Sequence, residues 1–290
     1  MKSKVSFLFV ELLTLMCLTA SIHAQTAEER ALLRAAYRVT GQLDSLNQAT
    51  ALVDTLWLTI CQGKAYYHHP LFYRQDSLNY AMENMTIEEY NRVYGGVFKG
   101  GSVYKKNYLN NDVCVQLRNK SIVYTSWGVN NVYYTEAQLP QWSIEQEEEN
   151  VAGFRCQKAT TTWRGRRWVA WFTREVPLPF GPWKLRGLPG LIVKAESSGT
   201  APYRFELVGI EKIDVPAKIF YNDASLERYM PSSFEEYTKL VYQKYLEPEK
   251  YYKTVLMSIG MQNVSFSGSY EAIEHFNPIE FLPERNGKKQ

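Results

Sequence analysis

Residues 152–176 read AGFRCQKATTTWRGRRWVAWFTREV, and this stretch decides the fold class. Both of its halves are rich in the aromatic and β-branched side chains that suit pleated strands. Arg164-Gly165-Arg166 separates the halves, as a short turn would. The stretch therefore predicts a hairpin of two antiparallel strands, Ala152–Trp163 and Trp168–Val176.

The second strand of this hairpin carries apolar side chains on both faces. Successive side chains of a strand point to opposite faces. One face carries Trp168, Ala170 and Phe172, and the other carries Arg167, Val169, Trp171 and Thr173. Neither of these two sets of side chains is purely polar, so we expect both faces to be covered, at least in part.

Most of the remaining chain consists of strand-like runs joined by short loops, which favour antiparallel pairing. Two segments instead have helical spacing and open with a capping box. We therefore expect a mainly β protein with a few packed α-helices. The other expected strands are Leu33–Leu43, Asp54–Tyr67, Val103–Leu117, Ser121–Tyr134, Leu191–Glu196 and Tyr203–Asp214, and the expected helices are Met85–Tyr94, capped by Thr86 and Glu89, and Ser232–Tyr245, capped by Ser233 and Glu236.

The N-terminus has the layout of a cleavable secretory signal peptide. Lys2 and Lys4 precede an apolar run over residues 5–20, and Ala24 supplies the small residue before a cut. A transmembrane helix needs about 20 clean apolar residues, whereas this run is shorter and contains Glu11. We expect cleavage after Ala24 and a product that is periplasmic or secreted.

The chain after residue 24 has an ordinary charge balance. Removing residues 1–24 lowers lysine plus arginine from 33 to 31 and aspartate plus glutamate from 30 to 29, so the net charge becomes 31 − 29 = +2. This balance gives no argument for nucleic-acid binding, and no later run is apolar enough to span a bilayer. The remaining 290 − 24 = 266 residues contain no linker or repeat. We expect a single domain over residues 25–290.

Three cysteines remain after residue 24, namely Cys61, Cys114 and Cys156. In an oxidising compartment they allow one disulfide and one free thiol. Buried free cysteines that pack as small hydrophobes are equally favoured. Their spacings match no metal motif, and the pairing stays open.

Residues 142–193 contain five of the seven tryptophans and two turn clusters. In the stretch Leu188–Leu191, Pro189 presets φ at the first central position of a type II turn, and the glycine that follows would take a positive φ. The proline-rich run Pro177–Pro182 bars helix and regular sheet. We expect this run to cross the surface or wrap an edge, with Trp183 pinning it down.

The run over residues 181–192, GPWKLRGLPGLI, resembles the signature of the GLPGLI family, which is named after the last six of these residues. Residues 153–159, Gly165-Arg166 with 170–173, and Asn277-Pro278 are also similar to the family pattern. The resemblance implies an exported protein of Bacteroidota-type bacteria, with no agreed activity and no catalytic residues to transfer. By analogy with periplasmic lipoprotein carriers, it implies a curved antiparallel sheet, partly open and barrel-like. The signature residues are Gly187, Leu188, Pro189, Gly190, Leu191 and Ile192.

Tryptophans and arginines of this region are the candidate binding residues. Aromatic faces and guanidinium groups together suit sugars, peptides or acidic ligands. In the alternative interpretation the tryptophans form core and the arginines form a solvated rim. Trp171→Ala separates the two, because a cleft residue would cost binding at an unchanged fold and a core residue would cost about 3–5 kcal/mol of stability. The candidates are Trp163, Arg166, Trp168, Trp171, Trp183 and Arg186.

The sequence contains no established catalytic or metal motif. His68 and His69 would point to opposite faces of a strand, and His275 is far away in sequence, so we expect no metal site. Cys156 could be a thiol nucleophile beside a histidine and an acid, but nothing in the sequence places a histidine there. The acidic run Glu145–Glu149 is expected to be an exposed loop.

These patterns favour an exported, non-enzymatic binding or accessory protein. It would hold an apolar or peptide-like ligand, or an envelope protein partner, near residues 163–192. The first alternative is an envelope enzyme that uses Cys156 or the histidines, and the second is a structural envelope component. No cofactor is part of any of the three expectations.

Overall fold

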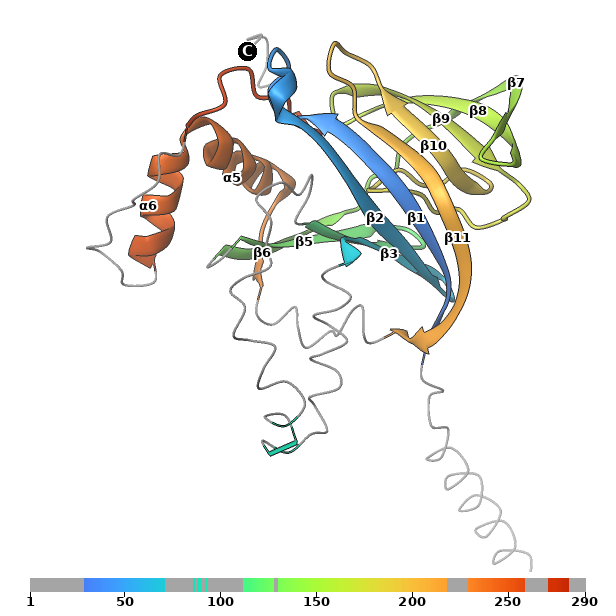
Figure 1. Cartoon of the computed structure of the whole chain (residues 1–290), viewed down its shortest axis with the longest axis horizontal. Coiled ribbons are helices and arrows are strands. Elements are labelled where there is room, and N and C mark those ends of the chain that lie inside the picture. The colour runs from blue at the N-terminus through green and yellow to red at the C-terminus, as the bar shows by residue number, and fades with distance from the viewer. Residues whose placement is uncertain are drawn as a thin grey trace, which may run out of the picture.

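The computed structural model describes residues 29–70, 86, 88, 89, 92, 112–127, 130–217, 229–258 and 271–281. Within them, twelve strands form one open, strongly curved sheet, with helices beside it (Figure 1). The expected fold, a mainly β protein with a curved antiparallel sheet and packed helices, is therefore confirmed. The expected signal peptide, residues 1–24, lies outside the described residues. No helix among the described residues is long and apolar enough to cross a membrane.

Most of the expected runs contain strands or helices of the structure. Of the expected strand Val103–Leu117, only residues 112–117 are described, and residues 103–111 lie outside the described residues. The strands are β1 (Arg30–Gln42), β2 (Ala51–Cys61), β3 (Lys64–His68), β4 (Asp112–Leu117), β5 (Ser121–Trp127), β6 (Asn130–Glu136), β7 (Ser143–Val151), β8 (Phe154–Trp163), β9 (Arg166–Thr173), β10 (Leu191–Ser197), β11 (Arg204–Pro216) and β12 (Met230–Pro231), and the helices are η1 (Gln48–Thr50), α5 (Phe234–Leu246) and α6 (Pro248–Ser258).

The sheet consists of two runs of hairpins joined in the middle. Its order is β12-β6-β5-β4-β3-β2-β1-β11-β10-β9-β8-β7. Strands β1 to β6 pair antiparallel in sequence order, as do β7 to β11, and the long strands β1 and β11 connect the two halves with Tyr37 opposite Leu207. The short strand β12 lies parallel to β6 at one edge, and β7 forms the other edge.

Two of the expected strands are each a pair of strands in the structure. The run Asp54–Tyr67 is interrupted at Gly63, whose φ of 82° turns the chain between β2 and β3. The run Ser121–Tyr134 is likewise divided between β5 and β6, which pair antiparallel. Glycine takes a positive φ without steric cost, so Gly63 inside the apolar run is the local signal for the first break.

The acidic run Glu145–Glu149 is a strand and not the expected loop. It forms the middle of β7, where Glu148 lies opposite Gln157 of β8. Its side chains are mostly exposed, as expected, and Glu147 pairs with Lys158 at 2.6 Å. Charged side chains on an edge strand deter pairing with other chains, which gives a physical reason for an acidic run at the end of the sheet.

Both expected capping boxes are present. At the start of α5, Ser233 accepts a hydrogen bond from the Glu236 N–H at 3.1 Å. Thr86 accepts from the Glu89 N–H at 3.3 Å, although most of the expected helix Met85–Tyr94 lies outside the described residues. Helix α6 has no counterpart among the expected elements.

The loop between β9 and β10, residues 174–190 and hereafter the signature loop, joins the two halves of the sheet. Gln116 of β4 donates from its amide nitrogen to the carbonyl oxygens of Gly181 and Trp183, at 2.6 and 2.7 Å. Arg186 donates to carbonyl oxygens of the β4–β5 turn. The loop thus connects strands that lie far apart in the sheet order, and it helps to hold the curvature.

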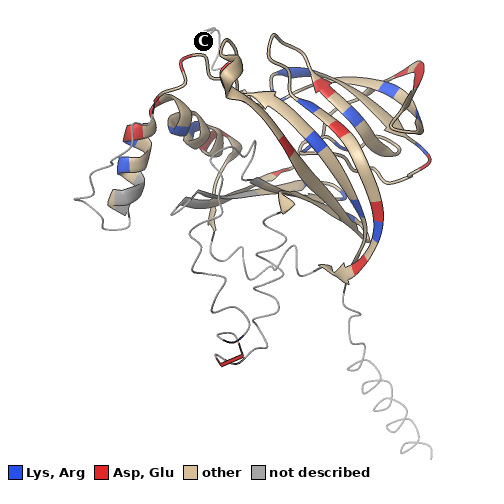
Figure 2. Cartoon of the chain, in the orientation of Figure 1, with Lys and Arg blue, Asp and Glu red and all other residues tan. Residues whose placement is uncertain are grey.

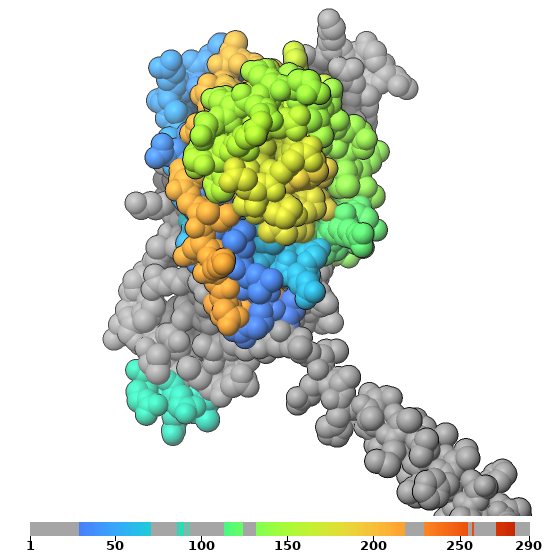
Figure 3. Space-filling model, turned by 90° about the vertical axis from the view of Figure 1, so that its right-hand side faces the viewer, coloured from blue at the N-terminus to red at the C-terminus, as the bar shows by residue number. Residues whose placement is uncertain are grey.

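Three prolines of the signature loop, Pro177, Pro179 and Pro189, lie at the centres of three-residue turns. The N–H after each one donates to the carbonyl oxygen before it, at 2.8 Å in all three cases. This is the γ-turn pattern, which suits the fixed φ of proline. Pro177 and Pro179 are exposed, whereas residues 180–186 are buried. Figure 3 shows part of the loop, in yellow, on the face turned to the viewer. The expected surface crossing therefore holds only for the first part of the loop.

The expected type II turn at Leu188–Leu191 is wrong. The positive φ falls at Gly187, at 92°, and not at Gly190. Gly190 is limited by space, because a Cβ there would lie closer than 3.0 Å to the carbonyl carbon and oxygen of Thr173. The absence of a side chain at Gly190 lets the end of the loop pass against the end of β9.

Candidate functional site

The six candidate binding residues are all buried, and the structure brings only some of them together. Trp168 and Trp183 pack on one face of the sheet with ring centroids 5.6 Å apart, and Trp168 also stacks on Phe205 at 5.9 Å. Trp171 lies on the opposite face of β9, because side chains alternate along a strand. Trp163 ends β8 on the same face as Trp168, because Thr161 lies opposite Trp168. The four tryptophans are therefore buried on two faces of the sheet, with Trp171 apart from the other three.

Trp171→Ala should accordingly cost stability. The side chain is 7% exposed, so its removal leaves a cavity in addition to the lost transfer free energy. We expect a loss of about 3–5 kcal/mol in the free energy of unfolding, measured by urea titration with circular dichroism. Val53→Ala, at a 70% exposed position of β2, is the control and should change it by less than about 0.5 kcal/mol. A variant as stable as the wild type would contradict the core assignment.

The expectation of a solvated arginine rim is wrong for Arg166 and Arg186, which are 4% and 2% exposed. Arg186 donates from Nη1 to the carbonyl oxygen of Lys120 at 2.9 Å and from Nη2 to that of Arg118 at 3.0 Å. Its own carbonyl oxygen accepts from the indole of Trp142 at 2.8 Å. Both terminal nitrogens of Arg186 are engaged by main chain, so its role is to clamp the signature loop.

Arg166 instead contacts a segment near the end of the chain. Residues 276–281, hereafter the C-terminal segment, cover the start of β9 and bend at Ile279 and Glu280. Arg166 donates from Nη2 to the side-chain oxygen of Asn277 at 2.6 Å and from Nε to the carbonyl oxygen of Pro278 at 3.1 Å. Its guanidinium lies near the rings of Tyr203 and Phe281, at 5.1 and 4.9 Å. Within the described residues, the three hydrogen bonds of this buried cation all go to the C-terminal segment.

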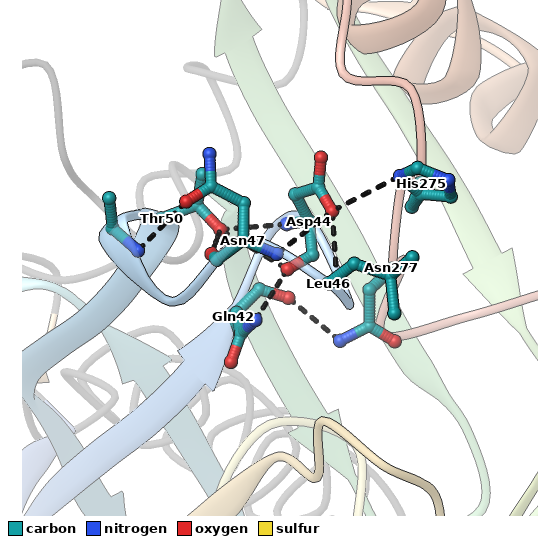
Figure 4. Close-up of polar contacts among 8 residues, drawn as sticks. Gln42, Asp44, Leu46, Asn47, Thr50, His275 and Asn277 are labelled. Carbon is teal, nitrogen blue, oxygen red and sulfur yellow. Dashed lines mark hydrogen bonds and ion pairs between the residues drawn. The ribbon is translucent and has the colours of Figure 1, made fainter.

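Asn277 is the most heavily bonded residue of the C-terminal segment. Its side-chain nitrogen donates to the carbonyl oxygens of Gln42 and Ala201, at 2.7 and 2.9 Å. Its carbonyl oxygen accepts from the Tyr203 hydroxyl at 2.7 Å, and its N–H donates to the carbonyl oxygen of Leu43 at 2.7 Å. Figure 4 shows how this residue faces the loop between β1 and β2. Asn277 thus joins the β1–β2 loop, the β10–β11 loop and the start of β9.

On the same loop, next to Asn277, Asp44 faces His275 across an ion pair with a 3.7 Å separation (Figure 4). The Asp44 carboxylate also accepts from the N–H groups of Leu46 and Asn47, at 3.0 and 3.2 Å. These bonds fix the loop in one conformation. The loop therefore presents ordered carbonyl groups to the C-terminal segment.

Lys184, in the buried part of the signature loop, is 1% exposed. Its ammonium group pairs with Glu280 and donates to the Tyr134 hydroxyl at 2.8 Å. It also lies 4.8 Å from the ring centroid of Trp183 and 5.3 Å from that of Phe234. Burial lowers the pKa of Lys184, with the Glu280 carboxylate acting in the opposite direction. Glu280 is thus the anionic partner of an ammonium enclosed by aromatic rings.

Trp183 is held in a left-handed conformation, with φ of 54°. This conformation costs roughly 1–2 kcal/mol for a residue with a side chain. The Gln116 bond to its carbonyl oxygen and its packing on Trp168 oppose that cost. The strain places the Trp183 ring on Trp168 while the next side chain, Lys184, points to Glu280.

The residues that make up the candidate site are only partly those expected. We define the Arg166–Lys184 site as the set whose atoms contact residues 277–280 of the C-terminal segment. Of these, Arg166 was among the candidates, and the Asn277-Pro278 pair belonged to the family pattern. Lys184 had a local signal, because it is a charge between the apolar residues Trp183 and Leu185, directly after the proline-rich run. The site consists of Gln42, Leu43, Arg166, Lys184, Ala201 and Tyr203.

The cysteines, His68 and His69 lie elsewhere. The three cysteines are free and buried, and burial raises the pKa of Cys61 and Cys114 to about 12 and that of Cys156 to about 11. His68 contacts Thr59, and His69 contacts Asp54. Among the described residues, no group of three or more histidine, cysteine, aspartate or glutamate side chains could hold a metal ion.

Burial of His68 predicts a pH dependence of stability. Desolvation lowers its pKa from 6.5 to about 4, so the unfolded chain takes up the proton first as the pH falls. The contribution of neutral His68 to the free energy of unfolding is therefore fully present above pH 6.5. It is lost between about pH 6.5 and 4, by up to about 3 kcal/mol. We expect His68→Gln to lose less stability than the wild type between about pH 7.5 and 4.5 in urea titrations. Parallel profiles for the two proteins would rule this out.

Comparisons with known proteins find a distant structural similarity alone. No protein-family model matches the chain, and no curated protein matches it. Among solved structures, PNGF-II is similar in two crystal forms. In space group P21 the TM-score is 0.48 at 12% identity, covering 74% of this chain and 34% of PNGF-II. In space group C2 it is 0.45 at 13% identity, covering 72% and 32%. This chain therefore spans about a third of the length of PNGF-II.

Proposed function

We propose that this chain is an exported, non-enzymatic accessory protein that binds a peptide segment of an envelope partner. The observation that carries the proposal is the Arg166–Lys184 site. Two buried cations there make polar contacts with residues 277–280 of the C-terminal segment. A guanidinium near aromatic rings and an ammonium among aromatic rings are suited to hold a peptide that carries a carboxylate.

The properties of the thiols and histidines also favour binding over catalysis. A nucleophilic cysteine works as thiolate, and burial raises the pKa of Cys156 to about 11. His68 is buried and contacts Thr59 and the carbonyl oxygen of its neighbour. The resemblance to the GLPGLI signature and the signal-peptide layout support export.

A photo-crosslinking experiment in the native host tests the proposal. A photoreactive amino acid replaces Phe281, which is 40% exposed at the end of the C-terminal segment, or Met230, which is 58% exposed at the far edge of the sheet. We expect mature protein beginning at Gln25 in the envelope fraction, and a protein adduct from position 281 and not from 230. Equal adducts from both positions, or none, would reject specific binding at this site.

A further inference from the structure

We infer that the Arg166–Lys184 site recognises a peptide with a carboxylate three residues after an asparagine, and that the C-terminal segment occupies it as an intramolecular ligand. This inference deepens the proposed function and rests on it for its biological meaning. Three kinds of contact carry it: to the main chain of the segment, to its side chains, and between charges.

The main chain of the C-terminal segment is held in the way a bound peptide is held. Its N–H groups at Asn277 and Phe281 donate to the carbonyl oxygens of Leu43 and Arg164, at 2.7 and 3.1 Å. A single isolated bridge, between Asp44 and Phe276, is the only β-pairing among its described residues. Main-chain hydrogen bonds supply affinity in peptide recognition, and here they hold both ends of a segment that bends at Ile279 and Glu280.

Side chains of the segment supply the selectivity. Asn277 satisfies two carbonyl oxygens and accepts from Arg166, a pattern that needs both an amide donor and an amide oxygen. Glu280 supplies the charge opposite Lys184. A peptide lacking either group would leave a buried polar atom without a partner, which is costly.

The C-terminal segment covers both cations of the site. With the segment in place, Arg166 and Lys184 are almost fully buried, and a buried cation without a partner is strongly unfavourable. Gly165 makes room for the segment, because a Cβ there would lie 2.7 Å from the Cβ of Phe281. A second peptide that takes the place of the segment and covers the cations would therefore have to supply the same partners.

Occupancy by the chain's own segment would weaken binding of a second peptide. A tethered ligand has a high effective concentration, so a peptide in solution competes poorly until the tethered ligand is weakened. Asn277→Ala in the full chain weakens the intramolecular ligand and leaves Arg166, Lys184 and Tyr203 intact. The free site should then accept the same sequence from solution.

The test measures fluorescence anisotropy of a labelled peptide with the sequence of residues 273–281, IEHFNPIEF. We expect Asn277→Ala to bind it at least about tenfold more tightly than the wild type does. A peptide with Glu280→Gln should bind the same variant about tenfold more weakly than the unmodified peptide. Glu247→Gln, which removes an exposed carboxylate at the end of α5, should bind like the wild type.

Several outcomes would overturn the inference. Equal affinities of the wild type, Asn277→Ala and Glu247→Gln would show that the segment is not a competing ligand. Equal affinities of the two peptides would remove the carboxylate requirement. If circular dichroism shows that Asn277→Ala does not fold, Phe276→Ala gives the same comparison. This substitution removes the ring that stacks on Tyr245 and so weakens the hold on the C-terminal segment.

The binding assay and the crosslinking experiment can give negative results independently of each other. The binding assay uses only purified chain and synthetic peptide, so a negative result leaves the crosslinking experiment as it stands. Tight peptide binding without an adduct from position 281 would keep the site and reject the envelope partner.

Discussion

Glu280→Gln is expected to lower the free energy of unfolding by about 3 kcal/mol, because it leaves the Lys184 ammonium buried without its anionic partner. Lys184 is 1% exposed, and the remaining polar contact, to Tyr134, carries no formal charge. The loss is measured by urea unfolding followed by tryptophan fluorescence. Glu247→Gln is the matched control, since its ion pair with Lys250 is exposed and should contribute less than about 1 kcal/mol.

A second substitution identifies the buried charge as the cause. Lys184→Met combined with Glu280→Gln should recover most of the lost stability, because replacing the members of a buried ion pair is often neutral, whereas removing one member is costly. Glu280→Gln should also lower the free energy of unfolding less in the Lys184→Met background than in the wild type. If the double variant is as unstable as the sum of the two single variants, the two residues are not coupled and this explanation fails.

Local features of the fold were predictable from the sequence. The capping boxes at Thr86 and Ser233 depend on residues three apart, and both are present. The hairpin at 152–176 follows from alternation and from the turn at Gly165, whose φ is 78°. Such patterns are set by neighbours within a few residues, so tertiary packing had little opportunity to override them.

The candidate site was only partly predictable, because its contacts are distant in sequence. Arg166 and Asn277 are separated by 111 positions, and Lys184 and Glu280 by 96. A charged residue is usually exposed, so the expectation of a solvated arginine rim followed the general rule. Arg166 departs from that rule because a segment from the end of the chain covers it and supplies its hydrogen-bond acceptors.

The role of Gly190 shows a different reason for a wrong expectation. Proline followed by glycine matches a type II turn, yet Gly190 has no positive φ. Sequence patterns record the residue type that a turn needs, and they do not record which neighbouring backbone passes close by. A glycine required for space therefore resembles a glycine required for its φ until the fold is known.

Gly190→Ala is consequently expected to destabilise the protein by about 3 kcal/mol, at the upper end for an added methyl group in a packed interior. The new Cβ would overlap the carbonyl of Thr173, which is backbone and cannot rotate away as a side chain could. Thr173 also lies opposite Leu191 at the start of the β9–β10 pairing. Relief of the overlap would therefore have to separate the two strands where the signature loop begins and ends.

The same substitution at Gly209 provides the control for Gly190→Ala. Gly209 lies in β11 and has no positive φ. A Cβ added to it would meet no other atom within 4 Å. Gly209→Ala should raise stability by about 0.5 kcal/mol, because alanine loses less backbone entropy on folding. The two changes are chemically identical, so opposite shifts in the urea midpoint would isolate the contact with Thr173. Equal midpoints for the two variants would contradict the close approach of the loop to β9.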